Sequence, residues 1–162
     1  MEGSRGLGDV YKRQDKRPVC VFVNASSEFI KESISYFKDP LLQFHGDETN
    51  QFCSSFKKDF WKVIHVKSIE SIDRIEEYPD ASAILFENYK KDQFGGTGES
   101  FDWDIVKKAN LSKKIVLSGG INVKNVDNAI STQPWCIDIN SGVESSIGIK
   151  NITLVNKILE KF

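Results

Sequence analysis

Residues 115–144 read IVLSGGINVKNVDNAISTQPWCIDINSGVE and contain the same local pattern twice. In each copy a short apolar run, residues 115–117 and then 136–139, ends in small residues, Ser-Gly-Gly and then Asn-Ser-Gly. Glycines let a chain approach an anion closely, and a helix expected over residues 123–130 would offer its positive N-terminal end to the first loop. A lone Gly-Gly after a strand is more often a plain turn, so it is the pair of loops that indicates a phosphate site.

The rest of the chain repeats one strand–helix unit. Apolar runs predict strands at residues 19–23, 41–44, 62–66, 83–86, 115–117 and 136–139. Helical spacing of apolar residues or loop context predicts helices over residues 26–37, 47–58, 68–77, 102–109, 123–130 and 153–160. Intervals of roughly 20 to 30 residues are typical of parallel βαβ crossovers. We therefore expect an α/β protein, a (β/α)8 TIM barrel represented by roughly its last six βα units, with an open doubly wound sheet as the alternative.

Composition restricts the class of partner. The 162 residues include 22 basic and 23 acidic side chains, giving a net charge of -1, and 40% of the residues are hydrophobic. This balance predicts one soluble domain without electrostatic attraction to nucleic acid or to a membrane. Three scattered cysteines make neither a disulfide framework nor a metal site, and no secretory segment is visible, so we expect a cytoplasmic protein.

The first residues differ from the rest. Residues 1–14, MEGSRGLGDVYKRQ, show no periodicity and resemble the translation of a sequencing-library adapter, with a disordered native tail as the alternative. We expect residues 15–162 to form the folded part, a partial barrel. On the adapter interpretation the native protein begins upstream of Asp15 and this chain is an N-terminally truncated fragment.

Two strand ends carry polar side chains, where a barrel keeps its chemistry. In QFHGDE, Gln43 and His45 are two residues apart on a strand and so point the same way, although a His beside a Gly is also a common turn residue. The segment 87–100, ENYKKDQFGGTGES, is long for a loop and rich in glycine, which favours a mobile flap over a pocket. It lacks the lysine and the spacing of a nucleotide-binding loop.

Four motifs in this order resemble the phosphoribosylanthranilate isomerases of tryptophan biosynthesis: QFHGDE, FGGTGESFDW, LSGGINVKNV and DINSGVESSIGIK. The resemblance runs from about Pro18 to the C-terminus. It implies an intramolecular aldose-ketose isomerase that needs no cofactor and no metal and that acts on a small phosphosugar. In such enzymes a general acid opens the ribose ring of N-(5-phosphoribosyl)anthranilate to a Schiff base, and a general base then removes the neighbouring proton, giving the aminoketose 1-(2-carboxyphenylamino)-1-deoxyribulose 5-phosphate.

The resemblance also assigns residues. The acid position, an aspartate in the family, falls on Glu87, with Asn88 as the runner-up because the loop length varies. Residues expected to line the substrate pocket are Gln43, His45 and Asp138, and those expected to donate backbone N–H groups to the phosphate are Gly119, Gly120, Ser141 and Gly142.

Two family features are missing from this sequence. The family's general base is a cysteine in a Cys-Gly pair after the first strand, and its substrate-binding arginine follows the second strand. None of Cys20, Cys53 and Cys136 precedes a glycine, so we assign no base and expect this chain to be inactive by itself. The parent enzyme could be a monomer, a dimer or fused to another enzyme of the pathway. A non-catalytic phosphosugar-binding domain and another phosphate-binding barrel enzyme are the alternatives.

Overall fold

A computed structural model describes residues 17–88, 103 and 113–162. Six strands form one parallel sheet in the order in which they occur in the sequence. These strands are β1 (Val19–Phe22), β2 (Leu41–Phe44), β3 (Phe60–Val66), β4 (Ala83–Asn88), β5 (Ile115–Leu117) and β6 (Cys136–Ile137). Consecutive order with parallel pairing is the arrangement of successive βα units in a barrel wall.

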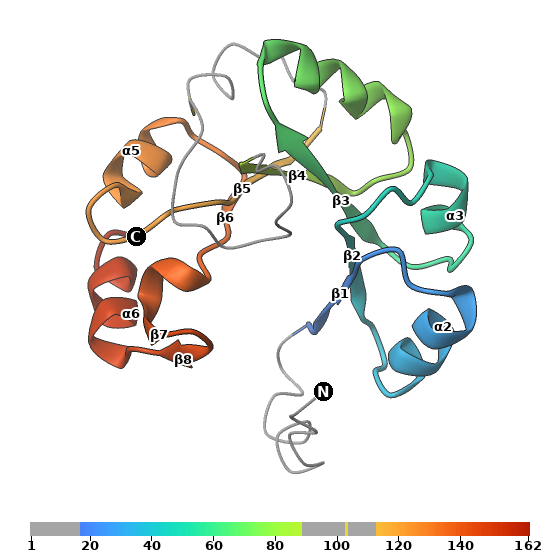
Figure 1. Ribbon diagram of the computed structural model, residues 1–162, viewed down its shortest axis with the longest axis horizontal. Coiled ribbons are helices and arrows are strands. Elements are labelled where there is room, and N and C mark those ends of the chain that lie inside the picture. The colour runs from blue at the N-terminus through green and yellow to red at the C-terminus, as the bar shows by residue number, and fades with distance from the viewer. Residues whose placement is uncertain (1–16, 89–102, 104–112) are drawn as a thin grey trace.

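The helices lie around the outside of this curved sheet, leaving β1 and β6 as its two edges (Figure 1). They are α2 (Ser27–Ser35), α3 (Asn50–Ser54), the 3₁₀ helix η1 (Ile69–Glu77), α5 (Val126–Ser131) and α6 (Ile152–Leu159), and a 3₁₀ turn, η2 (Ser141–Val143), follows β6. A short antiparallel hairpin, β7 (Glu144–Ser146) with β8 (Ile149–Lys150), precedes α6.

The two faces of the sheet have different neighbours because side chains alternate along each strand. Phe44, Ile64 and Phe86 belong to the large core that also holds helix residues such as Ile30 and Val126. The intervening residues on β3, β4 and β5 form a smaller cluster on the concave side: Val63, Ala83, Leu85 and Val116. Further along the same strands, towards their carboxyl ends, the residues that share this alternation also face the concave side of the sheet.

The expected sheet is confirmed, and the helices differ in detail. The helix expected from residue 47 begins at Asn50, because the Thr49 side chain caps it by accepting from the N–H of Phe52. The segment after β3 is a 3₁₀ helix instead of an α-helix. The β7–β8 hairpin was not predicted, since its three-residue and two-residue strands carry no apolar alternation.

Three sequence predictions lie outside the described residues, except that residues 87, 88 and 103 are described. These are the tail over residues 1–14, most of the flap over 87–100 and the helix over 102–109. Within the described part of the chain, no helix is long and apolar enough to cross a membrane.

Candidate active site

A cavity of about 470 Å³ opens at the carboxyl ends of the strands. It brings together the side chains expected at the site from strands β2, β4 and β6 and both small-residue loops. Its lining includes Gln43, His45, Glu87, Ser118, Gly119, Gly120, Asp138, Asn140, Ser141 and Gly142. These residues are far apart in the sequence. They meet here because the parallel strands end at the same edge of the sheet.

Glu87 is the carboxylate at the end of β4 and is only 8% exposed. Its Oε2 lies 3.6 Å from Nδ1 of His45 and 3.8 Å from Nδ1 of His65. Among the described residues, this buried oxygen has no hydrogen-bond partner. A buried carboxylate oxygen without a donor is costly, so a polar group of a bound molecule is the natural partner for it.

The choice between Glu87 and Asn88 follows from strand geometry. Glu87 lines the cavity. Asn88 is the next residue of the same strand, and its side chain therefore alternates to the other face. We accordingly keep Glu87, and not Asn88, as the candidate acid.

His45 is oriented by its own strand. Its Nε2 lies 2.5 Å from Oε1 of Gln43, the residue two positions earlier on β2, and its Nδ1 faces Glu87. The Gln43 oxygen can only accept, so this contact is a hydrogen bond in the tautomer that carries the proton on Nε2. The imidazole lies between Gln43 and the candidate acid.

Asp138 lies beyond the end of β6, beside Ser118. The Ser118 hydroxyl donates to Oδ2 of Asp138 at 3.3 Å. Burial raises the pKa of the Asp138 carboxyl, the Ser118 hydrogen bond opposes this, and the negative charge of Glu87 raises it further. A carboxyl group whose pKa is raised in this way is suited to holding a proton at the site.

The two small-residue loops pack directly against each other. Gly119 and Gly120 have positive φ values of 88° and 71°, which a side chain would disfavour. A Cβ on Gly142 would lie 1.8 Å from the carbonyl oxygen of Ile121, so only glycine allows this approach. The glycines therefore join the loops into one rim of the cavity.

One expectation about the first loop was wrong. Helix α5 starts at Val126 and not at residue 123, so its N-terminal end is further from Gly119 and Gly120 than expected. The side chains of Asn122 and Asn125 cause the delay, because both amides donate to the Gly120 carbonyl oxygen, at 3.0 and 2.9 Å. The expectation of a phosphate site therefore keeps the backbone N–H groups of the loops and loses the helix end.

Two residues of this neighbourhood were missed. His65, the penultimate residue of β3, lies 3.8 Å from Glu87, and Ser118, the residue after β5, donates to Asp138. Alternation along its strand places each of them on the concave face, whereas the register between neighbouring strands decides which residue it meets there.

The cysteines are where the sequence placed them, in β1, α3 and β6. Cys53 is buried, whereas Cys20 and Cys136 are partly exposed, and Cys136 lines the cavity. Burial raises the pKa of all three thiols, that of Cys53 to about 12. Each thiol is therefore protonated near neutral pH, in which form it is a poor base.

Parallel strands in consecutive order, with a polar cavity at their carboxyl ends, are the arrangement found in enzymes of the TIM-barrel class. The family model for "N-(5'phosphoribosyl)anthranilate (PRA) isomerase" matches residues 7–161. The chain belongs to this family of isomerases of tryptophan biosynthesis.

Individual relatives agree. The isomerase of Hahella chejuensis is 40% identical over 143 residues, which are 87% of this chain and 67% of that protein. The structure of phosphoribosyl anthranilate isomerase from Thermotoga maritima is similar with a TM-score of 0.80 at 28% identity, covering 94% of this chain and 78% of that one. A further structure, in complex with reduced 1-(o-carboxyphenylamino)-1-deoxyribulose 5-phosphate, has a TM-score of 0.75 at 27% identity and covers 94% of this chain and 77% of that one.

Proposed function

We propose that the cavity binds N-(5-phosphoribosyl)anthranilate and that Glu87 is the general acid of its Amadori rearrangement. The observation that carries the proposal is the Glu87 carboxyl, which is 8% exposed, lines the cavity and has an Oε2 without a hydrogen-bond partner among the described residues. An acid at this place can hydrogen-bond the ribose ring oxygen and protonate it as the ring opens.

The chemistry consists of two proton transfers. Protonation of the ring oxygen breaks its bond to the anomeric carbon and leaves a Schiff base with the anthranilate nitrogen. Loss of the proton from the adjacent carbon then gives an enolamine, which becomes the aminoketose. General acid catalysis of this kind contributes typically about 10² to 10⁴ in rate, and Glu87 would supply the first transfer.

The phosphate and the other polar groups of the substrate would bind on either side of Glu87. Gly119, Gly120, Ser141 and Gly142 line the cavity, and their backbone N–H groups would suit a phosphate. Asp138, Gln43 and His45 would contact the hydroxyl groups of the sugar or its amine.

The second transfer needs a base, and the family's cysteine of a Cys-Gly pair has no counterpart among Cys20, Cys53 and Cys136. The three thiols are held protonated by burial. We therefore expect this chain to bind the substrate and to open its ring without completing the rearrangement.

The acid step can be tested without the base step. The two anomers of the substrate interconvert through the ring-opened Schiff base, so an acid alone accelerates their exchange, which NMR can follow. We expect the chain to accelerate this exchange, Glu87→Gln to lose about 10²-fold of the acceleration, and the control Asn88→Ala to retain it. Equal acceleration by Glu87→Gln and the unmodified chain would refute the assignment. A folded chain that binds the substrate without accelerating the exchange would be a phosphosugar-binding domain.

A further inference from the structure

A buried ion pair lies directly behind the strand end that carries His45, on the helix-facing side of the sheet. Lys62 of β3 is 0% exposed and Glu48 is 6% exposed, which is rare for either residue type unless the charges are paired. The Lys62 Nζ lies 3.3 Å from Oε2 of Glu48. The large core adjoins this pair, and neither residue lines the cavity.

Lys62 makes two further contacts that define its position. Its Nζ donates to the carbonyl oxygen of Phe44 at 3.2 Å and to that of Gly46 at 2.5 Å. These are the two carbonyls on either side of His45. One ammonium group thus binds the carbonyl groups of both residues that flank His45, whose imidazole faces Glu87.

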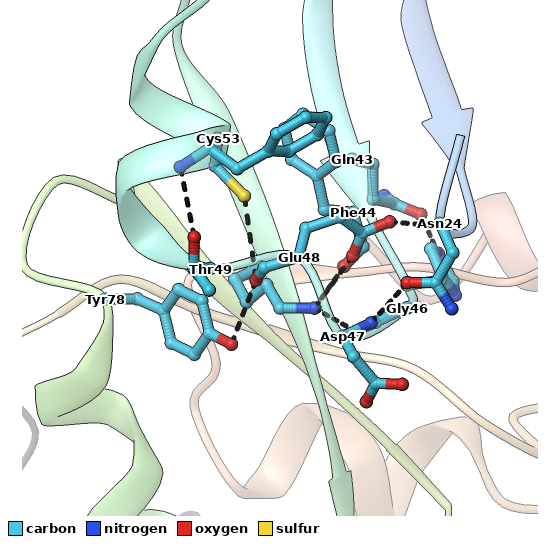
Figure 2. A network of polar contacts seen from close by, with 12 residues as sticks. Asn24, Gln43, Phe44, Gly46, Asp47, Glu48, Thr49, Cys53 and Tyr78 are labelled. Atoms are coloured by element: carbon cyan, nitrogen blue, oxygen red, sulfur yellow. Dashed lines mark hydrogen bonds and ion pairs between the residues drawn. The ribbon is translucent and has the colours of Figure 1, made fainter. Parts of the chain in front are cut away.

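Glu48 extends the network to the neighbouring strand. Its Oε1 accepts from the backbone N–H of Asn24, just after β1, at 2.7 Å. The Asn24 side chain in turn accepts from the N–H of Asp47 at 2.7 Å, as Figure 2 shows. A Cβ on Gly46 would lie 2.2 Å from Oδ1 of Asn24, so the glycine is required for this contact.

The surroundings restrict the pair to this arrangement. The Tyr78 hydroxyl donates to the Glu48 carbonyl oxygen at 3.2 Å, and its ring centre lies 5.4 Å from the Lys62 Nζ. Burial lowers the pKa of Lys62, and the negative charge of Glu48 opposes this. A buried pair of this kind is weak evidence for added stability, because desolvation offsets much of the attraction. Its geometric effect on the turn is the stronger reason for its presence.

We propose that Lys62 and Glu48 are positioning residues that fix the turn of residues 44–47 and so hold the His45 imidazole against Glu87. Neither residue touches the substrate. The inference about the reaction rests on the proposed function, whereas the inference about the position of His45 does not.

The test compares two variants of the whole chain. In the double variant Lys62→Met with Glu48→Gln no buried charge is left unpaired, so folding should survive, while both contacts to the carbonyls beside His45 are lost. The control is Ile84→Ala, because Ile84 is the register partner of Lys62 on β4 and is fully buried in the same core. It removes core packing without touching the turn.

Two measurements are made on each variant. The first is the NMR spectrum of the imidazoles, which contains only His45 and His65. The second is the affinity for reduced 1-(o-carboxyphenylamino)-1-deoxyribulose 5-phosphate, by calorimetry. We expect the double variant to shift the His45 signals and to bind the analogue at least about tenfold more weakly. The control should lose thermal stability but keep the His45 signals and the affinity of the unmodified chain.

Unchanged His45 signals in a folded double variant would overturn the proposal, and so would an equal change in the control. If the unmodified chain does not bind the analogue, the proposed function fails, and the NMR comparison still decides the positioning role. If the double variant does not fold, Asn24→Ala replaces it, because Asn24 is exposed and, within the described part of the chain, its side chain hydrogen-bonds the N–H of Asp47. It should shift the His45 signals in the same direction, and unchanged signals would count against the proposal.

Discussion

Gly142 joins the two loops of the proposed phosphate site, and a single methyl group there should separate them. An ideal Cβ on Gly142 would lie 1.8 Å from the Ile121 carbonyl oxygen and 2.8 Å from its carbon, whereas real Cβ atoms essentially never approach closer than 3.0 Å. Both of these Ile121 atoms belong to the backbone, so no side chain can rotate away. The loops must therefore move apart by roughly 1 Å.

We predict that Gly142→Ala weakens binding of the reduced product analogue by about tenfold to 100-fold, because displacement of about 1 Å is enough to cost a site 10²-fold in rate. The free energy of unfolding should fall by about 1 to 3 kcal/mol, as for other overpacked positions. Calorimetry measures the first quantity and thermal or urea denaturation the second.

Gly148 provides a matched control. It has a positive φ of 78°, but a Cβ there would meet no atom within 4 Å, so Gly148→Ala should cost about 1 kcal/mol of backbone strain and leave the affinity unchanged. If Gly142→Ala binds the analogue as tightly as the unmodified chain, the contact between the loops has no bearing on ligand binding and the reasoning is refuted.

Three further predictions concern titratable groups. The raised pKa of Asp138 means that the folded state binds a proton more tightly than the unfolded state, so stability is lost as pH rises from the ordinary carboxyl range through the folded pKa. Asp138→Asn should remove this loss of unfolding free energy, which amounts to about 1.4 kcal/mol for each unit of pKa shift. Denaturation at pH 4 and pH 7 measures it, and the same pH dependence in the variant and the unmodified chain would contradict the prediction. Ser118→Ala removes the hydrogen bond that lowers the pKa of Asp138, so carboxyl NMR should show that pKa rising further; a fall would count against the contact. With its pKa raised to about 12, Cys53 should remain unmodified by iodoacetamide at pH 8 in the folded chain, and mass spectrometry showing it modified as fast as Cys20 would exclude its burial.

The sheet could be predicted from the sequence because each strand is a short apolar run bounded by polar or small residues. Ile115 to Leu117 and Leu41 to Phe44 were placed with their observed bounds for this reason. Helix bounds were harder, because side-chain hydrogen bonds decide them. Thr49 delays the start of α3, and Asn122 and Asn125 shape the turn before α5.

The candidate site was predicted where a motif marks a strand end and missed where none does. Gln43, His45 and the glycine loops carry recognisable patterns, and all of them line the cavity. His65 lies within an unremarkable apolar strand, and only the register between β3 and β4 places it opposite Glu87. The Lys62–Glu48 pair could not be predicted for a related reason. The two residues are 14 positions apart in the sequence and come into contact only when β2 and β3 pair.

The most direct test of the central claim is calorimetric titration of the whole chain with reduced 1-(o-carboxyphenylamino)-1-deoxyribulose 5-phosphate. The account predicts saturable binding of one molecule per chain that inorganic phosphate weakens by competition, because both ligands would use the loops at Gly119 and Gly142. A folded chain that does not bind the analogue, or that binds it equally well in excess phosphate, would contradict the assignment of this cavity as the phosphosugar site.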